Sequence, residues 1–154
     1  MKSNRRRARE FALQGLYQWL LGGDSAEVIK TQLSERTDYH KIDTEFFRNL
    51  ITGVIANADE LRAKLQPYLD RPVSELNPVE HAILLAGAFE LENQLDIPYK
   101  VVINEAVEVA KTFSGTDAHK YVNGVLDKLA KELRPTETKI NIVQKSTRAV
   151  PSKA

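Results

Sequence analysis

Apolar residues recur every three or four positions along most of this chain, which is the spacing that places them on one face of an α-helix. The first such stripe runs over residues 4–21 and ends at Gly22. A second, shorter stripe follows a candidate cap at Asp24 or Ser25 and stops before the polar residues 34–41. The pattern therefore predicts two helices in this part of the chain.

The most regular stripe follows Asp43, a good N-cap residue, and continues to Leu65. We expect one long amphipathic helix over residues 43–65. Further along, Asn77-Pro78-Val79-Glu80 combines an N-cap, a proline at the first helical position and an acid at the third. The stretch that follows, HAILLAGAFEL, is apolar nearly all round. We therefore expect residues 82–91 to form the central helix, buried by several neighbours.

Two further stripes, at residues 102–113 and 121–133, are separated by the turn residues 114–117. After Pro135 the chain is mostly polar and has little periodicity, which predicts a flexible tail that folding does not require. No strand pattern competes with the helices. The predicted fold is all-α: a compact helical domain of about six to seven helices over residues 1–134, followed by a disordered C-terminal tail at 135–154.

Composition narrows the class of protein. The chain has 154 residues, a formal net charge of +1 and no cysteine, which excludes disulfides, thiolate chemistry and zinc-thiolate sites. The longest apolar run, residues 82–89, is far shorter than the roughly 20 residues of a transmembrane helix. We expect a cytoplasmic protein that has no membrane anchor.

Candidate catalytic groups are few. The three histidines lie far apart in the sequence (His40, His81 and His119), and no metal-binding spacing or glycine-rich phosphate loop is present. Glu80 and His81 are neighbours, but adjacent helical residues point about 100 degrees apart. Asp117 is interpreted first as a helix cap rather than as a metal ligand. We expect no enzymatic activity, no metal and no cofactor.

The start of the chain concentrates positive charge. Five basic residues lie within eight positions, and no acid precedes Glu10: Lys2, Arg5, Arg6, Arg7 and Arg9. On a helix that begins near Asn4 they form a ridge that can face phosphates. Arginine favours bidentate phosphate contacts and stacking on bases. The alternatives are a solvated terminus or a helix at a membrane surface.

A second candidate RNA-binding feature surrounds Tyr121. Lys120 precedes this ring and Asn123 follows it, so a cation, an aromatic ring and an amide lie within about one helical turn. This combination suits the recognition of unpaired bases. Tyr121 is equally compatible with a core residue whose hydroxyl reaches the surface. The pattern leaves both interpretations open.

Three stretches together resemble the NusB family of bacterial transcription antitermination factors: RRRAREFALQGLYQW, LNPVEHAILLAGAFEL and PYKVVINEAVEVAKTFSGTDAHKYVNGVLDKLA. The resemblance covers residues 2–134 and implies two packed helical subdomains. It also implies a non-enzymatic adaptor that binds the single-stranded boxA RNA of ribosomal RNA leader transcripts. In that family the partners are a small ribosomal subunit protein, NusE, and the antitermination complex of RNA polymerase.

The resemblance further implies roles for particular residues. The expected RNA contacts are Lys2, Arg5, Arg6, Arg7, Arg9, Glu80, Asp117, Lys120 and Tyr121. The expected contacts with the partner protein are Tyr17, Ser74 and Pro78. The alternative is a detached RNA-binding module that works with a separate ribosomal RNA methyltransferase, although no catalytic domain follows here.

Overall fold

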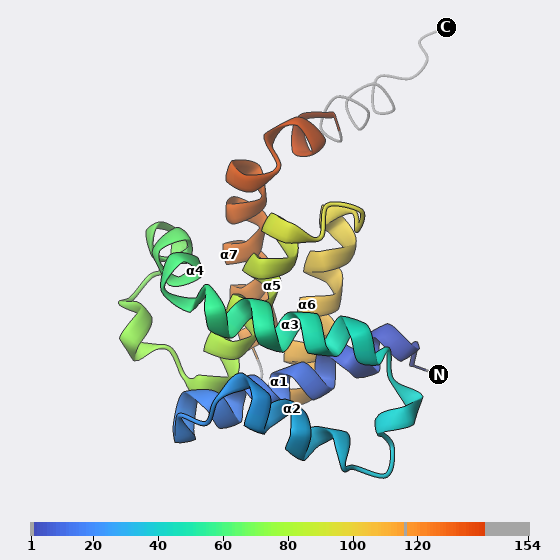
Figure 1. Ribbon diagram of the computed structural model, residues 1–154. Helices are drawn as coiled ribbons and strands as arrows, with labels where there is room; N and C mark the ends of the chain where they lie inside the picture. The colour runs from blue at the N-terminus through green and yellow to red at the C-terminus, as the bar shows by residue number, and fades with distance from the viewer. Residues whose placement is uncertain (1, 116, 141–154) are drawn as a thin grey trace, which may run out of the picture.

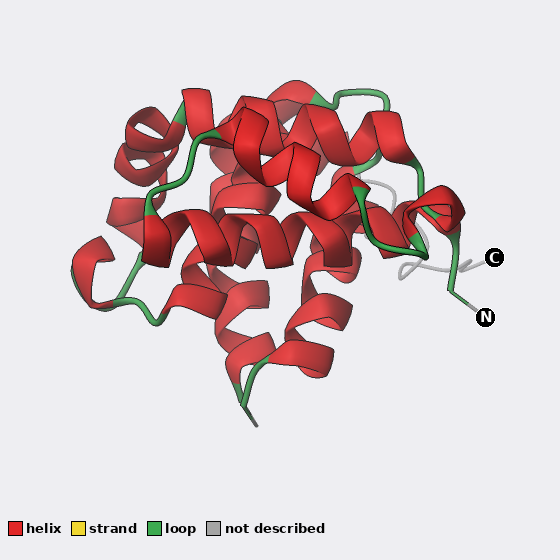
Figure 2. Ribbon diagram, turned by 60° about the horizontal axis from the view of Figure 1, so that its bottom comes forward, coloured by secondary structure: helices red, strands yellow, loops and turns green. Residues whose placement is uncertain are grey.

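The computed structural model describes residues 2–115 and 117–140, and every regular element within them is a helix (Figure 2). The α-helices are α1 (Asn4–Gly22), α2 (Ala26–Ser34), α3 (Thr44–Ala56), α4 (Ala58–Leu65), α5 (Pro78–Asn93), α6 (Tyr99–Phe113) and α7 (Ala118–Leu133). Short 3-10 helices lie in the connections: η1 (Tyr39–Lys41), η2 (Gln66–Tyr68) and η3 (Val73–Glu75). The predicted all-α fold is confirmed. None of the described helices combines the length and apolar character needed to cross a bilayer.

The helices form two groups (Figure 1). The first group is α1, α2 and α3, which pack on one another, and the second is α5, α6 and α7. Helix α5 also contacts α1, α3 and α4, so it joins the two groups. One continuous apolar core runs through both, in agreement with the two packed subdomains that were expected.

Helix α5 is the centre of this core, as predicted. Its residues Ala82, Leu84, Leu85, Ala88 and Leu91 have no exposed surface. Where α3 crosses α5, a Cβ atom on Gly53 would lie only 2.2 Å from the ring of Phe89. Glycine at this position therefore permits the close approach of the two helices.

Side-chain caps start several of the helices. In each case a side-chain oxygen accepts a hydrogen bond from the backbone N–H three residues later: Ser3 caps α1, Ser25 caps α2, Asp43 caps α3 and Asn77 caps α5. Each bond satisfies an N–H that has no partner within its own helix. These helices thus begin where short-range sequence signals indicate.

The prediction of a single long helix over residues 43–65 is wrong, because the helix is interrupted at Asn57. The side-chain amide of Asn57 donates to the carbonyl of Gly53 at 2.8 Å, and its backbone N–H donates to the same oxygen at 3.1 Å. These bonds complete the last turn of α3, but the backbone of Asn57 leaves helical geometry (φ −115°, ψ 20°), so α3 ends there and α4 starts at Ala58. Both helices turn their apolar faces to the same core, so the hydrophobic stripe continues across the break and does not reveal it.

The region after α7 also differs from expectation. Residues 135–140, the part of the predicted tail that the structure describes, are helical, and Thr138 is 5% exposed. The buried Arg134 donates to the carbonyls of Leu91 and Glu90 at the end of α5, at 2.8 and 3.0 Å. The folded body therefore extends past residue 134. The rest of the predicted tail, 141–154, lies outside the described residues.

Candidate nucleic-acid interface

The basic residues at the start of α1 do not share one environment. Lys2 and Arg5 are exposed, and Arg6 and Arg7 are half-buried. The side chain of Arg9, in contrast, is only 7% exposed. Lys2, Arg5, Arg6 and Arg7 are called the arginine cluster below.

Arg9 belongs to the core. Its Nε and Nη2 atoms donate to the two carboxylate oxygens of Glu90 at 3.0 and 2.7 Å, and the Glu90 side chain is 3% exposed. The guanidinium also lies 4.8 Å from the ring centroid of Phe46. Burial raises the pKa of the Glu90 carboxyl, and the hydrogen bonds from Arg9 act in the opposite direction. The expected phosphate contact by Arg9 is therefore corrected: its side chain faces α5 and not solvent.

Most of the arginine cluster is already paired with carboxylates. Arg6 donates to both oxygens of Glu105 on α6, at 2.9 and 2.7 Å, and this hydrogen bonding lowers the pKa of the Glu105 carboxyl. In a second pair, Arg5 Nη2 lies 3.4 Å from Asp43 Oδ2. In a third pair, Lys2 Nζ lies 2.7 Å from Glu10 Oε2.

Arg7 differs from its neighbours, because it forms no ion pair with any residue that the structure describes. An incoming phosphate must compete with a carboxylate at Lys2, Arg5 and Arg6. Arg7 offers its charge without such competition.

Tyr121 lies in a second cluster with the loop that follows η2. The backbone N–H of Asp70 donates to the Tyr121 hydroxyl at 3.2 Å. The Arg71 guanidinium lies 5.0 Å from the Tyr121 ring centroid and donates to the Asp70 carboxylate at 2.7 and 3.1 Å. The ring is half-buried against the core, and burial raises the pKa of its hydroxyl. Of the two interpretations left open, the structure shows a tyrosine whose ring packs inward and whose face is covered by Arg71.

The other expected RNA contacts have different surroundings. Glu80 is 7% exposed, and one of its carboxylate oxygens accepts from the Asn77 side-chain amide at 2.8 Å, which completes the predicted cap of α5. Asp117 and Lys120 are exposed at the start of α7 and lie 3.4 Å apart. Asp117 occupies the cap position but makes no side-chain cap hydrogen bond, so its expected capping role is corrected.

The expected RNA contacts therefore divide between the two ends of α5. The arginine cluster lies near the C-terminal half of α5, where Arg9 meets Glu90. A second group lies near the N-terminal end of α5 and joins the expected Lys120 and Tyr121 to Asp70 and Arg71. The pKa of Arg71 is raised mainly by its hydrogen bond to Asp70, and the carboxylate of Glu80, at the start of α5, acts in the same direction. This second group is called the tyrosine cluster below.

The residues expected to contact a protein partner are only partly brought together. Tyr17, 40% exposed, lines a shallow groove of about 240 Å³ with Leu13, Gln14, Val79 and Phe113. Pro78 precedes Val79 at the first position of α5. Ser74 is exposed in η3 but does not line this groove.

Sequence reasoning missed the acids that pair with the arginines. Glu90 carried a usable signal, because a carboxylate inside the apolar stretch HAILLAGAFEL needs a buried cation beside it. Asp70 and Arg71 carried none, since they lie in a loop without periodicity. Within residues 2–115 and 117–140, no group of histidine and acidic side chains is arranged to hold a metal ion.

Comparison with known proteins identifies the family. The sequence profile of the NusB family matches residues 6–131. The chain is 58% identical over 138 residues to the transcription antitermination protein NusB of Paraburkholderia phymatum, covering 90% of this chain and 95% of that protein. It is 54% identical over 140 residues to NusB of Bordetella pertussis, covering 88% of this chain and 91% of that one.

Solved structures agree with the sequence comparison. NusB of T. maritima superimposes with a TM-score of 0.77 at 30% identity, over 90% of this chain and 99% of that chain. A chain from the crystal structure of antitermination factors NusB and NusE in complex with dsRNA gives a TM-score of 0.74 at 25% identity, over 86% and 99%. Sequence and fold therefore match together over most of the length, and the chain belongs to the NusB family.

Proposed function

We propose that this protein is a transcription antitermination factor that binds the boxA RNA of ribosomal RNA leader transcripts together with the small ribosomal subunit protein NusE. In this way it helps elongating RNA polymerase to resist termination. Its relatives bear the name transcription antitermination protein, and a similar chain was crystallised with NusE and dsRNA. The observation on this chain that carries the proposal is the arginine cluster at the accessible start of α1.

The arginine cluster supplies affinity through phosphate contacts. At Arg5 and Arg6 a phosphate replaces Asp43 or Glu105, so one ion pair is exchanged for another. The favourable free energy of binding then comes mainly from the release of counterions from the RNA, so affinity falls steeply as the salt concentration rises. Such contacts position the RNA and carry little sequence information.

The tyrosine cluster supplies contacts to bases. The Arg71 guanidinium lies over the Tyr121 ring, so a base can stack on the guanidinium plane or take its place on the ring. Lys120, the residue before Tyr121 on α7, is exposed and paired with Asp117, so a phosphate that reaches it replaces this carboxylate. Because the two clusters lie at opposite ends of α5, one RNA strand that contacts both must run along the molecule.

The groove beside Tyr17 suits a protein partner. Tyr17 and Phe113 are large aromatic residues that are 40% and 39% exposed, and the groove between them is mostly apolar. Aromatic residues of this kind are enriched at protein interfaces. The mechanism is therefore assembly of a complex and involves no chemical turnover.

A titration with boxA RNA at several salt concentrations tests the RNA-binding role. Arg7→Ala should make the slope of log affinity against log salt shallower by about 0.7, because one phosphate contact on a single strand is lost. Tyr121→Ala should weaken binding by about 1–3 kcal/mol through lost stacking and leave the slope unchanged. Lys131→Ala, an exposed lysine near the end of α7, is the matched control. Equal affinity of the wild-type protein for boxA and scrambled RNA, with NusE present, would refute the proposal.

A second measurement tests the partner. Tyr17→Ala should weaken the binding of NusE and leave the RNA affinity of the isolated chain unchanged, because Tyr17 lies outside both RNA clusters. Recovery of a ribosomal RNA methyltransferase in a pull-down, without the ribosomal protein, would contradict the antitermination role and favour a module of a modification enzyme.

A further inference from the structure

A cleft of about 560 Å³ lies between the first half of α1 and the connection from α2 to α3. This volume falls within the range of about 300–1,000 Å³ that is typical of small-ligand sites. Its lining is polar except for one ring: Lys2, Arg7, Glu10, Phe11, Gln14, Arg36, Asp38 and Lys41. Three of these eight residues, Arg36, Asp38 and Lys41, come from the connection that the sequence pattern marked only as a break between helices.

The charge in this cleft is not balanced. Its two acids are each engaged by one of its four cations: Glu10 pairs with Lys2 at 2.7 Å, and Asp38 pairs with Arg36 at 3.3 Å. Arg7 and Lys41 remain, and neither forms an ion pair within the described part of the chain. Two cations without partners in one cleft favour the binding of an anion.

The guanidinium of Arg36 lies over an aromatic ring. It is 4.8 Å from the ring centroid of Phe11, and it also donates to the side-chain oxygen of Gln14. The Phe11 ring is itself held edge-on against Phe47, with the centroids 6.0 Å apart. The Arg36 side chain nevertheless remains 43% exposed. A guanidinium plane that is supported on one side and accessible to solvent provides a surface on which an unpaired base can stack.

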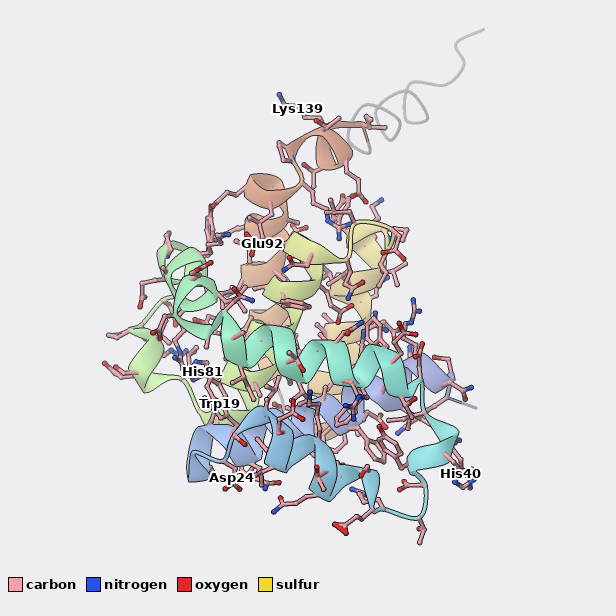
Figure 3. The ribbon with its side chains drawn as sticks, viewed as in Figure 1. Trp19, Asp24, His40, His81, Glu92 and Lys139 are labelled. Carbon is pink, nitrogen blue, oxygen red and sulfur yellow. The ribbon has the colours of Figure 1, made fainter. Side chains whose placement is uncertain are left out.

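Hydrogen bonds hold the loop against α1. The backbone N–H of Asp43 donates to the carbonyl of Asn4 at 3.0 Å, which joins the end of the loop to the first turn of α1. Within the loop, the N–H of Lys41 donates to the carbonyl of Asp38 at 3.0 Å, in the turn that contains η1. Figure 3 places His40, the neighbour of Lys41, on this loop beside the N-terminal end of α1. The positions of Arg36 and Lys41 relative to α1 are therefore defined by the fold.

We propose that this cleft binds one nucleotide of a single-stranded RNA, with the phosphate between Arg7 and Lys41 and the base on the guanidinium of Arg36. The inference rests on the RNA-binding function proposed above and extends the RNA contact from Arg7 to Arg36 and Lys41, which lie outside the N-terminal basic run. Arg7 belongs to both the arginine cluster and the cleft, so the RNA strand can pass from one to the other without a gap.

Two variants of the full-length chain test the site in an RNA titration at several salt concentrations. Lys41→Gln should make the salt slope shallower by about 0.7, because one phosphate contact is lost. Arg36→Lys keeps the charge but removes the flat guanidinium, so it should weaken binding at least about fivefold with the slope unchanged. Lys131→Gln, which removes a lysine charge outside the cleft, should leave both quantities unchanged.

The outcomes separate this site from the general RNA-binding role. If both cleft variants bind RNA like the wild-type protein while Tyr121→Ala weakens binding, the cleft proposal is overturned and the proposed function stands. If the wild-type protein binds no RNA, both fall. If Lys41→Gln weakens the binding of NusE and leaves RNA affinity unchanged, the cleft is a protein contact and the nucleotide site is overturned. Because Lys41 is exposed, its variant should fold, and its thermal midpoint checks this.

Discussion

Replacing Arg9 by methionine should destabilise the protein strongly and leave its contact with RNA phosphates unchanged. Methionine replaces the aliphatic part of the arginine side chain but removes the cation beside Glu90. Glu90 is then a buried carboxylate that has lost the donors at 3.0 and 2.7 Å. Glu105, whose carboxylate lies 3.6 Å from the Arg9 guanidinium, loses one of its two cationic partners and keeps Arg6.

The magnitude follows from the burial of the pair. The Arg9 and Glu90 side chains are only 7% and 3% exposed, so solvent screens their interaction weakly. Each charge-assisted hydrogen bond contributes about 1.5–3 kcal/mol, and breaking one side of a buried pair costs about 3–5 kcal/mol. Domains of this size unfold with a free energy on the order of 5–15 kcal/mol. Arg9→Met should therefore lose about 3–5 kcal/mol, and adding Glu90→Leu should restore most of it, since no unpaired charge remains.

The loss should also depend on pH. Burial already raises the pKa of Glu90 above its ordinary value of 4.5, and removing Arg9 raises it further. Between 4.5 and that raised pKa, the folded variant binds a proton that the unfolded chain releases. The stability of Arg9→Met should therefore increase as pH falls through this window, which narrows its difference from the wild-type protein.

Urea unfolding measures these changes, with far-UV circular dichroism and the fluorescence of Trp19, the single tryptophan. The same protein is titrated with RNA across salt concentrations, and Arg7→Ala serves as the comparison. A loss of less than about 1 kcal/mol would refute the buried-pair reasoning. A salt slope as shallow as that of Arg7→Ala would show instead that Arg9 contacts RNA.

Three further predictions concern stability. Leu84→Ala should lower the free energy of unfolding by about 2–5 kcal/mol, because this fully buried side chain leaves a cavity in α5; urea midpoints measure it. Ending the chain after Arg134 should lower the thermal midpoint by a few degrees, because it removes the buried Thr138. His81 accepts a hydrogen bond from Arg62 at 3.1 Å, and burial lowers its pKa from 6.5 to about 4. As pH falls across that window the unfolded chain takes up the proton first, so up to about 3 kcal/mol of stability should be lost, and unfolding of His81→Gln over the same pH range should lack this loss.

Each of these predictions has an outcome that contradicts it. An unchanged urea midpoint for Leu84→Ala would mean that α5 is not the centre of the core. A shortened chain with the wild-type thermal midpoint would mean that residues 135–140 add nothing to stability. If the free energy of unfolding depended on pH in the same way for His81→Gln and the wild-type protein, protonation of His81 would not contribute to the loss of stability.

Local signals in the sequence were enough to predict most of the helices. Ser3 and Asn77 cap α1 and α5 through hydrogen bonds to residues three positions away, so the information lies within one turn. The apolar character of HAILLAGAFEL likewise predicts a central helix whatever its neighbours are. The basic start of α1 was visible for the same reason, since charge in a short window needs no fold to be recognised.

Only the tertiary structure decided which of those charges are available. Arg9 and Glu90 are 81 positions apart, and their contact depends on how α1 packs against α5. Two contacts of a guanidinium with an aromatic ring, Arg71 over Tyr121 and Arg36 over Phe11, likewise join different parts of the fold. Helical periodicity states which face a residue occupies, but it does not state which helix or loop that face will meet. Whether an arginine is buried in an ion pair or accessible to RNA therefore depends on packing between segments that are distant in the chain.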